Sequence, residues 1–348
     1  MLRVSLKNEE KEAFPKRLFF AILAVKRLSA LKNIYMAEKK KILVVGHRGM
    51  LGQELVRVFS IDATCEVTGW DREEIDITDF SLLEERLASL QPDIVINAAA
   101  YNGVDSCEES EAENEKALVL NRDVPGKLAL LSKKLHFVLV HYSSNYVFDG
   151  ALEKKGSGGC GSGVCCGGGC HGSEGDGYSE EAVPNPLSRY GMTKYLGEQA
   201  LQKQGEKYYL IRLSKLFGKP GDSPAAKQSF FGMMLELAKT RSELQVVDDE
   251  KSCFTYAPDL AVATKELIES ASPYGIYHLV NQGSVTWFEA AQELFQQAGK
   301  SIKVIPVESG AFPRPAKRPS NATLLNTKRL PLRPYQEALR EYVSLLSA

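Results

Sequence analysis

Between residues 41 and 213, short apolar runs alternate with stretches in which apolar residues recur at helical spacing. The apolar runs, such as "KILVV" and "DIVINAAA", are continuous, which is typical of parallel strands that are covered on both faces. A strand followed by a helix, repeated along the chain, predicts a doubly wound parallel sheet. The expected strands cover residues 41–45, 66–70, 93–100, 137–143 and 208–213, with helices at 50–59, 80–90, 112–133 and after Pro186.

Beyond Gly218, helical and strand patterns follow each other without this regular order. Doubly wound sheets bind ligands beyond the carboxyl ends of their strands, where a second lobe supplies a lid and a pocket. We therefore predict a Rossmann-type domain over residues 39–218 and a smaller mixed α/β lobe, mainly for substrate binding, over residues 219–348. In this lobe we expect helices within 229–240, 258–270 and 286–299, strands at 275–280 and 303–307, and a Pro-rich connector at 312–321.

Residues 1–38 precede the first strand and combine basic residues with a short apolar centre, Phe19 to Val25. No small-residue cleavage site follows this centre, so the pattern does not favour a secretory signal. We expect a disordered leader or a mis-assigned start, with Met36 as the alternative first residue. An amphipathic surface helix and a targeting segment are the other interpretations.

Residues 156–177 interrupt the predicted Rossmann-type domain with eleven glycines and four cysteines. Such a composition cannot bury a core, which favours a disordered insert. Thiolates and imidazole are also ligands of zinc, although the paired C-x-x-C spacing of strong zinc motifs is missing. The candidate metal ligands in this alternative are Cys160, Cys165, Cys166, Cys170 and His171.

The 348-residue chain is 44% hydrophobic and carries 43 basic and 44 acidic side chains, a formal net charge of -1. This balance gives no reason to expect nucleic acid as a partner. No apolar run approaches the roughly 20 residues of a membrane-spanning helix, so we expect no membrane partner. Seven cysteines, an odd number, in a chain without an export signal predict reduced thiols and a cytoplasmic location.

The stretch "GHRGMLG" follows the first expected strand and opens the first expected helix. Gly46, Gly49 and Gly52 therefore stand where a dinucleotide-binding fold needs a tight turn, a close approach to the pyrophosphate, and close helix packing. The spacing is G-x-x-G-x-x-G rather than G-x-G-x-x-G, and a glycine-rich turn without a ligand is the alternative.

Asp71 ends the second expected strand, where an acidic side chain would bind a ribose 2'-hydroxyl. This position supports a dinucleotide cofactor. Arg48 in the glycine loop and Arg72 beside Asp71 would instead suit a 2'-phosphate, or would be solvated surface charges. The sequence therefore predicts NADH or NADPH and does not separate them.

Tyr190 and Lys194 lie four residues apart in a helix that Pro186 and the N-cap residue Ser188 begin. The expected strand before them ends near Ser144. Reduction of a ketone needs a proton donor for the oxygen, and a nearby ammonium favours the phenolate and lowers the pKa of the phenol. A serine hydroxyl would bind the carbonyl oxygen. The three residues predict a reductase site, whereas the spacing alone is also that of a surface pair.

Residues from about 41 to 345 resemble the dTDP-4-dehydrorhamnose reductases, a family of extended short-chain dehydrogenase/reductases. The matching motifs, in the order in which the family has them, are "GHRGMLGQEL", "DREEIDITD", "PDIVINAAAYNGVD", "YVFDG", "PNPLSRYGMTKYLGEQ", "ELQVVDDE", "GIYHL" and "RPSNATLLNTKRL". Their shared order is more specific than any one motif.

The resemblance implies a catalytic triad of Ser144, Tyr190 and Lys194, in which Tyr190 donates the proton and Lys194 also holds the nicotinamide ribose. It further implies a cofactor site in which the glycines cradle the pyrophosphate, and Asp76 and Ile77 lie by the adenine. The implied cofactor-binding residues are Gly46, Arg48, Gly49, Met50, Leu51, Gly52, Asp71, Arg72, Asp76, Ile77, Ala98, Ala99, Ala100, Tyr190 and Lys194.

On the substrate side, the resemblance points to Asn102, Val104, Asn145 and Lys215. Three of these differ from the family pattern: Asn102 replaces a threonine, Asn145 an aspartate, and Lys215 a tryptophan. A cation in place of an aromatic wall leaves the identity of the sugar open. The alternative for Lys215 is a side chain turned to solvent.

The expected activity is NAD(P)H-dependent reduction of a nucleotide-linked 4-keto-6-deoxy sugar, with dTDP-4-dehydro-L-rhamnose as the first candidate. The alternatives are a nucleotide-sugar epimerase or dehydratase, and a non-catalytic dinucleotide-binding regulatory subunit. By resemblance only, Glu54 in the first helix matches one position of a magnesium-bridged homodimer, so Mg2+ and a second copy of the chain are further candidate partners.

Overall fold

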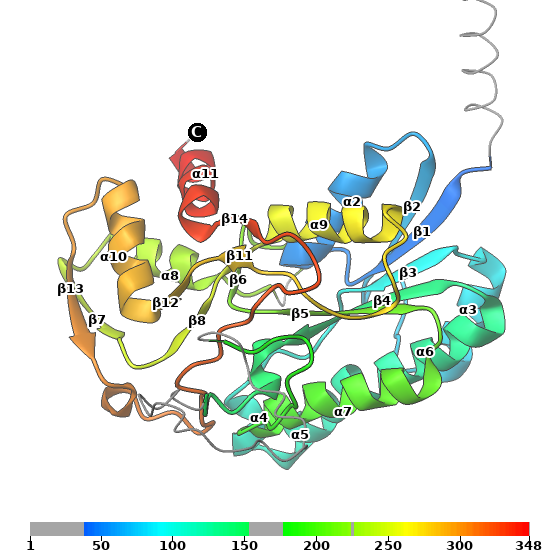
Figure 1. Ribbon diagram of the computed structural model, residues 1–348, viewed down its shortest axis with the longest axis horizontal. Helices are drawn as coiled ribbons and strands as arrows, with labels where there is room; N and C mark the ends of the chain where they lie inside the picture. Colours follow the sequence, from blue (N-terminus) through cyan, green and yellow to red (C-terminus); the bar gives the residue numbers. More distant parts are fainter. Residues whose placement is uncertain (1–37, 153–176, 224–225, 348) are drawn as a thin grey trace, which may run out of the picture. The chain divides into compact units, whose positions relative to one another are not determined.

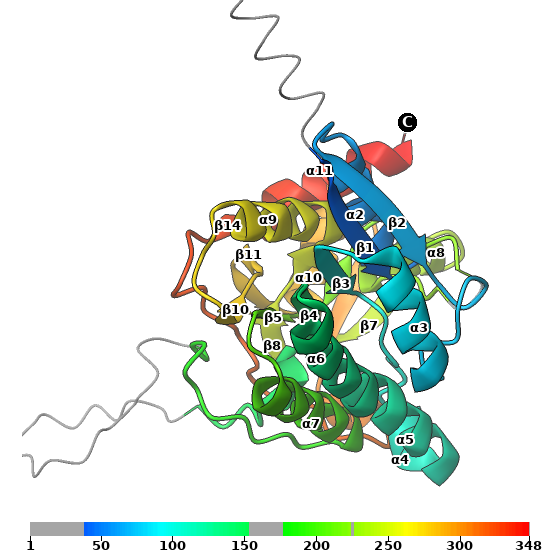
Figure 2. The same cartoon turned by 90° about the vertical axis from the view of Figure 1, so that its right-hand side faces the viewer.

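Six parallel strands form the main sheet of the computed structural model, which describes residues 38–152, 177–223 and 226–347. The residues from Lys40 onward form one compact unit. In spatial order the sheet is β10-β5-β4-β3-β1-β2, of which Figure 1 labels β1 to β5 and Figure 2 also labels β10. Its strands are β1 (Lys40–Val45), β2 (Cys65–Trp70), β3 (Ile94–Asn97), β4 (Val138–Ser144), β5 (Tyr208–Leu213) and β10 (Gly275–His278).

Helices cover both faces of this sheet, as Figure 2 shows. Alternate residues of β1 point to opposite faces, so Ile42 and Val44 pack into one apolar core and Leu43 and Val45 into another. Both faces are buried, which confirms the predicted doubly wound parallel sheet. The first core includes α2 (Met50–Ser60) and α9 (Ala257–Glu269), and the second includes α3 (Phe80–Leu90), α6 (Val124–Leu135) and α7 (Arg189–Gln204).

The helix expected at residues 112–133 is interrupted. A π-helical turn at Val119–Asp123 separates α5 (Glu111–Leu118) from α6, and the short helix α4 (Ser106–Glu109) precedes them. The Asn121 side chain bonds the backbone of Tyr101 and the hydroxyl of Thr193 on α7. These bonds compete with a regular helix, and π-turns of this kind often mark functional sites.

A further apolar core lies in the C-terminal part of the chain and is rich in aromatic residues, among them Phe217, Phe231 and Phe254. The helices and short strand pairs around it confirm a smaller mixed α/β lobe. Its helices are α8 (Phe230–Leu237), α10 (Trp287–Gln297) and α11 (Tyr335–Ser347), and its paired strands are β7 (Glu243–Val247) with β13 (Lys303–Val307), and β8 (Lys251–Cys253) with β12 (Ser284–Thr286).

Two elements expected in this lobe belong instead to the main sheet. The strand at residues 275–278 is β10, which pairs in parallel with β5, and the helix at 257–269 is α9, which packs on α2. Local sequence patterns do not encode such long-range pairing. The remaining short strands are β6 (Leu216–Phe217), β9 (Thr255–Tyr256), β11 (Asn281–Gln282) and β14 (Leu332–Pro334).

The predictions for residues 1–37, and for the zinc ligands between residues 160 and 171, lie outside the described residues. Within the described ranges, no helix is both long and apolar enough to cross a membrane.

Candidate functional site

The switch point of the main sheet lies between β1 and β3. The chain passes from β1 to β2 on one side and returns to β3 on the other, so the connections at the carboxyl ends of β1 and β3 diverge. Gly46 follows β1, and Ala98 to Ala100 follow β3. The two predicted cofactor segments therefore meet at the edge where doubly wound sheets bind ligands.

Two glycines of the loop are required by its geometry. Gly46 has a φ of +79°, and a Cβ there would lie 2.8 Å from the backbone nitrogen of Ala99. A Cβ on Gly52 would lie 2.0 Å from the carbonyl oxygen of Gly46. Gly49 is the N-cap of α2 and provides no side-chain cap, so Met50 and Leu51 form the first helical turn with their backbone N–H groups available to an anion.

The acidic and basic groups beside this loop are largely paired. The Asp71 carboxylate accepts the backbone N–H groups of Arg48, at 3.2 Å, and of Arg72, at 2.9 Å. The Arg48 guanidinium pairs with Glu74 at 2.8 Å and Glu73 at 3.5 Å. Arg72 is exposed and forms no ion pair with another described residue. Of the two arginines, Arg72 is therefore the one whose positive charge no described carboxylate neutralises.

Asp76 and Ile77 follow β2 in the same region. The Asp76 carboxylate accepts the backbone N–H and the hydroxyl of Thr78, and these bonds lower the pKa of Asp76. Ile77 is partly buried against the apolar core beneath β1. Both side chains therefore stabilise the local turn, and a contact with adenine remains a prediction.

Ser144, Tyr190 and Lys194 come together at the carboxyl end of β4. Ser144 ends β4, while Tyr190 and Lys194 lie in the first turns of α7, whose N-cap Ser188 accepts the backbone N–H of Gly191 at 3.1 Å. The Lys194 ammonium donates to the carbonyl oxygen of Tyr142 at 2.8 Å. The Ser144 hydroxyl group is close enough to that of Tyr190 to lower the pKa of the phenol.

The pKa of the tyrosine in this triad differs from the prediction that a nearby ammonium lowers it. Burial raises the pKa of Tyr190 above its ordinary value, and Tyr146 adds to the rise, while the Ser144 hydroxyl group opposes it. Desolvation by the described residues raises the pKa of Tyr190 by more than Lys194 could lower it. The prediction that the protein's own side chains lower this pKa is therefore wrong. Burial lowers the pKa of Lys194 to about 8, against the effect of Glu198 one helical turn away.

The four residues predicted for the substrate side have different surroundings. Asn102 accepts the Tyr190 hydroxyl at 3.4 Å, and Val104 packs beside the cluster that contains Tyr190. Asn145 is buried and donates to the carbonyl oxygen of Ala322 at 3.3 Å, so its amide supports the fold. The Lys215 ammonium lies 3.6 Å from the centroid of the Trp287 ring, and this excludes the solvent-facing alternative.

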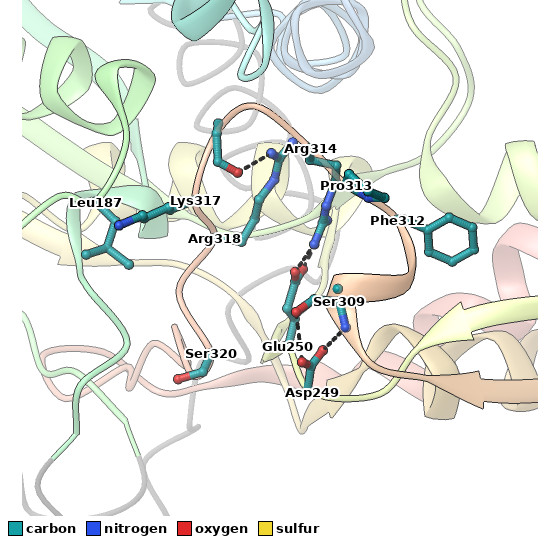
Figure 3. A pocket seen from close by; sticks show the side chains of 12 residues that line it. Leu187, Asp249, Glu250, Ser309, Phe312, Pro313, Arg314, Lys317, Arg318 and Ser320 are labelled. Carbon is teal, nitrogen blue, oxygen red and sulfur yellow. Dashed lines mark hydrogen bonds and ion pairs between the residues drawn. The ribbon is translucent and has the colours of Figure 1, made fainter.

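A cavity of about 400 Å³ is lined mostly by residues 309–320, a segment for which sequence patterns predicted only a connector. In Figure 3, Arg314 points toward Glu250, with which it forms an ion pair, and Ser309 points toward Asp249. The cavity is lined by Leu187, Asp249, Glu250, Ser309, Gly310, Phe312, Pro313, Arg314, Ala316, Lys317, Arg318 and Ser320.

Arg318 links this cavity to the triad. Its guanidinium pairs with both carboxylate oxygens of Asp105, at 2.5 and 2.6 Å, and hydrogen-bonds the hydroxyl of Tyr146. The Tyr146 ring packs edge-on against Tyr190, with centroids 5.7 Å apart. Sequence reasoning missed Arg314, Arg318, Glu250 and Tyr146. The three basic residues among the three prolines of "PRPAKRP" were the available signal.

Among the described residues, no group of three or more His, Cys, Asp and Glu side chains could hold a metal ion. Glu54, the candidate for a magnesium-bridged dimer, pairs with Arg57 at 2.7 Å on the same helix. The structure thus gives no support for Mg2+.

A doubly wound sheet with a glycine turn at its switch point, and a tyrosine and a lysine at its carboxyl edge, is the architecture of the Rossmann-type extended short-chain dehydrogenase/reductases. Within this class, the model of the RmlD substrate binding domain family matches residues 40–347. The chain therefore belongs to this family, which confirms the resemblance found in its motifs.

Individual relatives agree with this assignment. Over 307 residues, the chain is 32% identical to the spore coat polysaccharide biosynthesis protein SpsK of Bacillus subtilis, covering 87% of this chain and 96% of the relative. It is 32% identical to the dTDP-4-dehydrorhamnose reductase of Escherichia coli, covering 83% and 90%. A solved dTDP-4-dehydrorhamnose reductase of Bacillus anthracis in complex with NADP is 29% identical, with a TM-score of 0.76 and coverage of 89% and 100%.

Proposed function

We propose that the protein reduces a nucleotide-linked 4-keto-6-deoxy sugar with NADPH or NADH, and that dTDP-4-dehydro-L-rhamnose is the first candidate substrate. The observation that carries the proposal is the meeting of Ser144, Tyr190 and Lys194 at the carboxyl end of β4, in the same sheet whose switch point holds the glycine loop. The names of the relatives support the type of sugar.

The described residues fit a bound dinucleotide. A side chain at Gly46 or Gly52 would fill the space around the loop, and the first turn of α2 offers free N–H groups to a pyrophosphate. We propose NADPH as the better cofactor, because the exposed Arg72 is the cation beside Asp71 that no described carboxylate neutralises. When bound, the reduced nicotinamide supplies the hydride.

The chain's own residues supply the proton and the alignment. As the C4 carbon gains the hydride, Tyr190 gives its phenolic proton to the C4 oxygen, so that the ketone becomes a hydroxyl group. Ser144 donates a hydrogen bond to the same oxygen. Lys194, held by the carbonyl oxygen of Tyr142, provides a positive charge beside the phenolate that forms and contacts the ribose of the cofactor.

The cavity suits the nucleotide diphosphate of the substrate. Arg314, Lys317 and Arg318 line it, and guanidinium groups bind phosphate oxygens in pairs. Arg318 reaches Tyr146, which packs on Tyr190, so a sugar attached to a diphosphate in the cavity extends toward the proton donor. We propose that the smaller lobe, residues 219–348 apart from α9 and β10, mainly serves this binding.

The test is a panel of dTDP-linked 4-keto sugars offered with NADPH or NADH while the absorbance of the reduced cofactor is followed. We expect one cofactor consumed for each sugar reduced. Product formed without net consumption of added cofactor would indicate an epimerase or dehydratase with resident NAD. Dinucleotide binding without turnover of any sugar would indicate a regulatory subunit, and either result contradicts the proposal.

A further inference from the structure

A buried ion pair lies one helical turn beyond Lys194 on α7. The Arg212 guanidinium donates to both carboxylate oxygens of Glu198, with distances of 2.9 Å from Nε to Oε1 and 2.7 Å from Nη2 to Oε2. Each of these two side chains is only 1% exposed. The removal of two charges from water is costly, and the replacement of a buried ion pair by apolar side chains is often neutral or stabilising. Stability alone therefore does not explain why this pair lies here.

The ion pair lies beside the triad. Arg212 on β5 is the parallel partner of Ser143 on β4, which directly precedes Ser144. Glu198 and Lys194 are four residues apart on α7, and side chains at this spacing share one helix face. The Lys194 side chain is buried like the ion pair. The Glu198 carboxylate therefore has two cations as possible partners, Arg212 from the sheet and Lys194 from its own helix.

Further contacts hold the Arg212 guanidinium in place. It lies 5.1 Å from the centroid of the Phe148 ring. It also donates two long hydrogen bonds, one of 3.5 Å to the carbonyl oxygen of Glu180 and one of 3.4 Å to Nε2 of His278. Burial and the charge of Arg212 lower the pKa of His278 to about 3, so this ring is neutral and accepts the bond. Arg212 is thus the cation that neutralises Glu198.

We propose that Arg212 is a positioning residue for Lys194: by neutralising Glu198, it prevents Lys194 from pairing with this carboxylate and leaves the Lys194 ammonium at the triad. In the structure this ammonium donates to the carbonyl oxygen of Tyr142 near the carboxyl end of β4, at 2.8 Å. A buried carboxylate without a cation is strongly unfavourable, so in the absence of Arg212 the Lys194 side chain would turn toward Glu198. The inference rests on the proposed function, because it concerns the lysine of the proposed reaction.

The experiment compares Arg212→Met, Glu198→Gln and the double variant in their steady-state kcat for dTDP-4-dehydro-L-rhamnose and in their NADPH affinity by fluorescence titration. Arg212→Met leaves Glu198 to Lys194, so we expect kcat and NADPH affinity each to fall at least about tenfold, the size of one lost charge-assisted hydrogen bond. Glu198→Gln removes the competing carboxylate. Alone or combined with Arg212→Met, it should keep both quantities within about threefold of wild type.

All measurements are made at pH 6. Burial lowers the pKa of Lys194 to about 8 and Glu198 opposes this decrease, so a pH well below 8 keeps the ammonium charged in the Glu198→Gln variants as well. The matched control is Lys265→Met. This variant removes the cation of a partly buried ion pair with Asp62, before the start of β2 and thus at the opposite edge of the sheet. It should keep wild-type kcat and NADPH affinity.

A purely structural role of the ion pair predicts a different order of effects. Removal of either partner would then cause similar losses, and the double variant would be no better than Arg212→Met. Equal losses in the two single variants, a double variant that fails to recover, or wild-type kcat and NADPH affinity in Arg212→Met would each overturn the inference.

Thermal unfolding establishes that each variant is folded. If Arg212→Met does not fold, Arg212→Gln supplies the second test, because its amide carries no charge to neutralise Glu198 and the same recovery by Glu198→Gln is expected. Absence of ketone reduction by the wild type, with the loss and the recovery of NADPH affinity intact, would overturn the proposed function alone.

Discussion

The two sides of the proposed active site are built in opposite ways. The dinucleotide side is formed by the backbone of consecutive residues, Gly46 to Gly52, and it requires that the glycines of this loop carry no side chain. The cavity side uses charged side chains from segments far apart in the sequence, which meet in pairs such as Arg314 with Glu250 and Arg318 with Asp105. One side is therefore a local structure, whereas the other is a product of the tertiary fold.

The largest expected effect lies where the two sides meet, at Tyr190. Tyr190→Phe removes the proposed proton donor and keeps the ring that packs on Tyr146. We expect kcat to fall by about 10² to 10⁴, the usual contribution of a general acid, with NADPH affinity within about twofold of wild type. Steady-state rates and a fluorescence titration with NADPH measure the two quantities. Wild-type turnover in this variant would remove Tyr190 from the mechanism.

Gly52→Ala tests the dinucleotide side. Its Cβ would lie 2.0 Å from the carbonyl oxygen of Gly46, a backbone atom that moves only if the loop moves. We expect NADPH affinity to drop at least about tenfold, since the loss of a few hydrogen bonds to the pyrophosphate costs more than 1.4 kcal/mol.

Gly310→Ala is the matched control on the cavity side, because a Cβ at Gly310 meets no atom within 4 Å. It should leave both NADPH affinity and thermal stability close to wild type. Equal losses of NADPH affinity in the two variants would mean that the glycine loop is not the cofactor site.

Arg314→Met tests the cavity side. The variant removes a cation proposed for the diphosphate and keeps an unbranched side chain in place of the aliphatic part of the arginine. We expect KM for the nucleotide sugar to rise about 10- to 100-fold, since a hydrogen bond to a charged group contributes about 1.5–3 kcal/mol, while KM for NADPH stays constant. Steady-state kinetics with each substrate varied in turn separates the two effects. An equal rise in KM for NADPH would argue against separate binding sites for the nucleotide sugar and the cofactor.

The pH dependence of kcat/KM for NADPH reports on Lys194. Burial lowers the pKa of Lys194 to about 8, so its ammonium is lost as pH rises through 8, well below the ordinary pKa of lysine. We therefore expect kcat/KM to decline above about pH 8, by about tenfold for each further pH unit if the charged form alone is active. A flat profile up to pH 9.5 would contradict the role of Lys194.

The smallest effect is expected at Arg72. Arg72→Ala removes an exposed cation, so we expect KM for NADPH to rise only about three- to tenfold, with KM for NADH unchanged. The ratio of the two KM values measures the preference directly. Equal changes for both cofactors would show that Arg72 does not contact a 2'-phosphate.

The sequence was sufficient for features whose determinants lie close together along the chain. Continuous apolar runs predicted five strands of the main sheet, and the glycines after β1 predicted a turn that the φ of Gly46 requires. The spacing of Tyr190 and Lys194 predicted one helix face, and the hydroxyl of Ser144 lies beside it as expected.

Features that depend on tertiary contacts were not predictable in the same way. The place of β10 at the edge of the main sheet depends on pairing with β5, which no local pattern encodes. The stacking of Lys215 on Trp287 joins the segment after β5 to the start of α10. The pKa of Tyr190 depends on how completely it is buried, and burial is a property of the packed structure rather than of residue spacing.

Isotopic labelling tests directly whether the protein reduces a sugar ketone at this edge of the sheet. The wild-type protein is given a dTDP-linked 4-keto-6-deoxy sugar and NADPH deuterated at the transferable position, and the product is examined by mass spectrometry and NMR. We predict one deuterium, bound to C4 of the sugar, for each NADPH oxidised. A product without deuterium, or with deuterium at another carbon, would contradict the account.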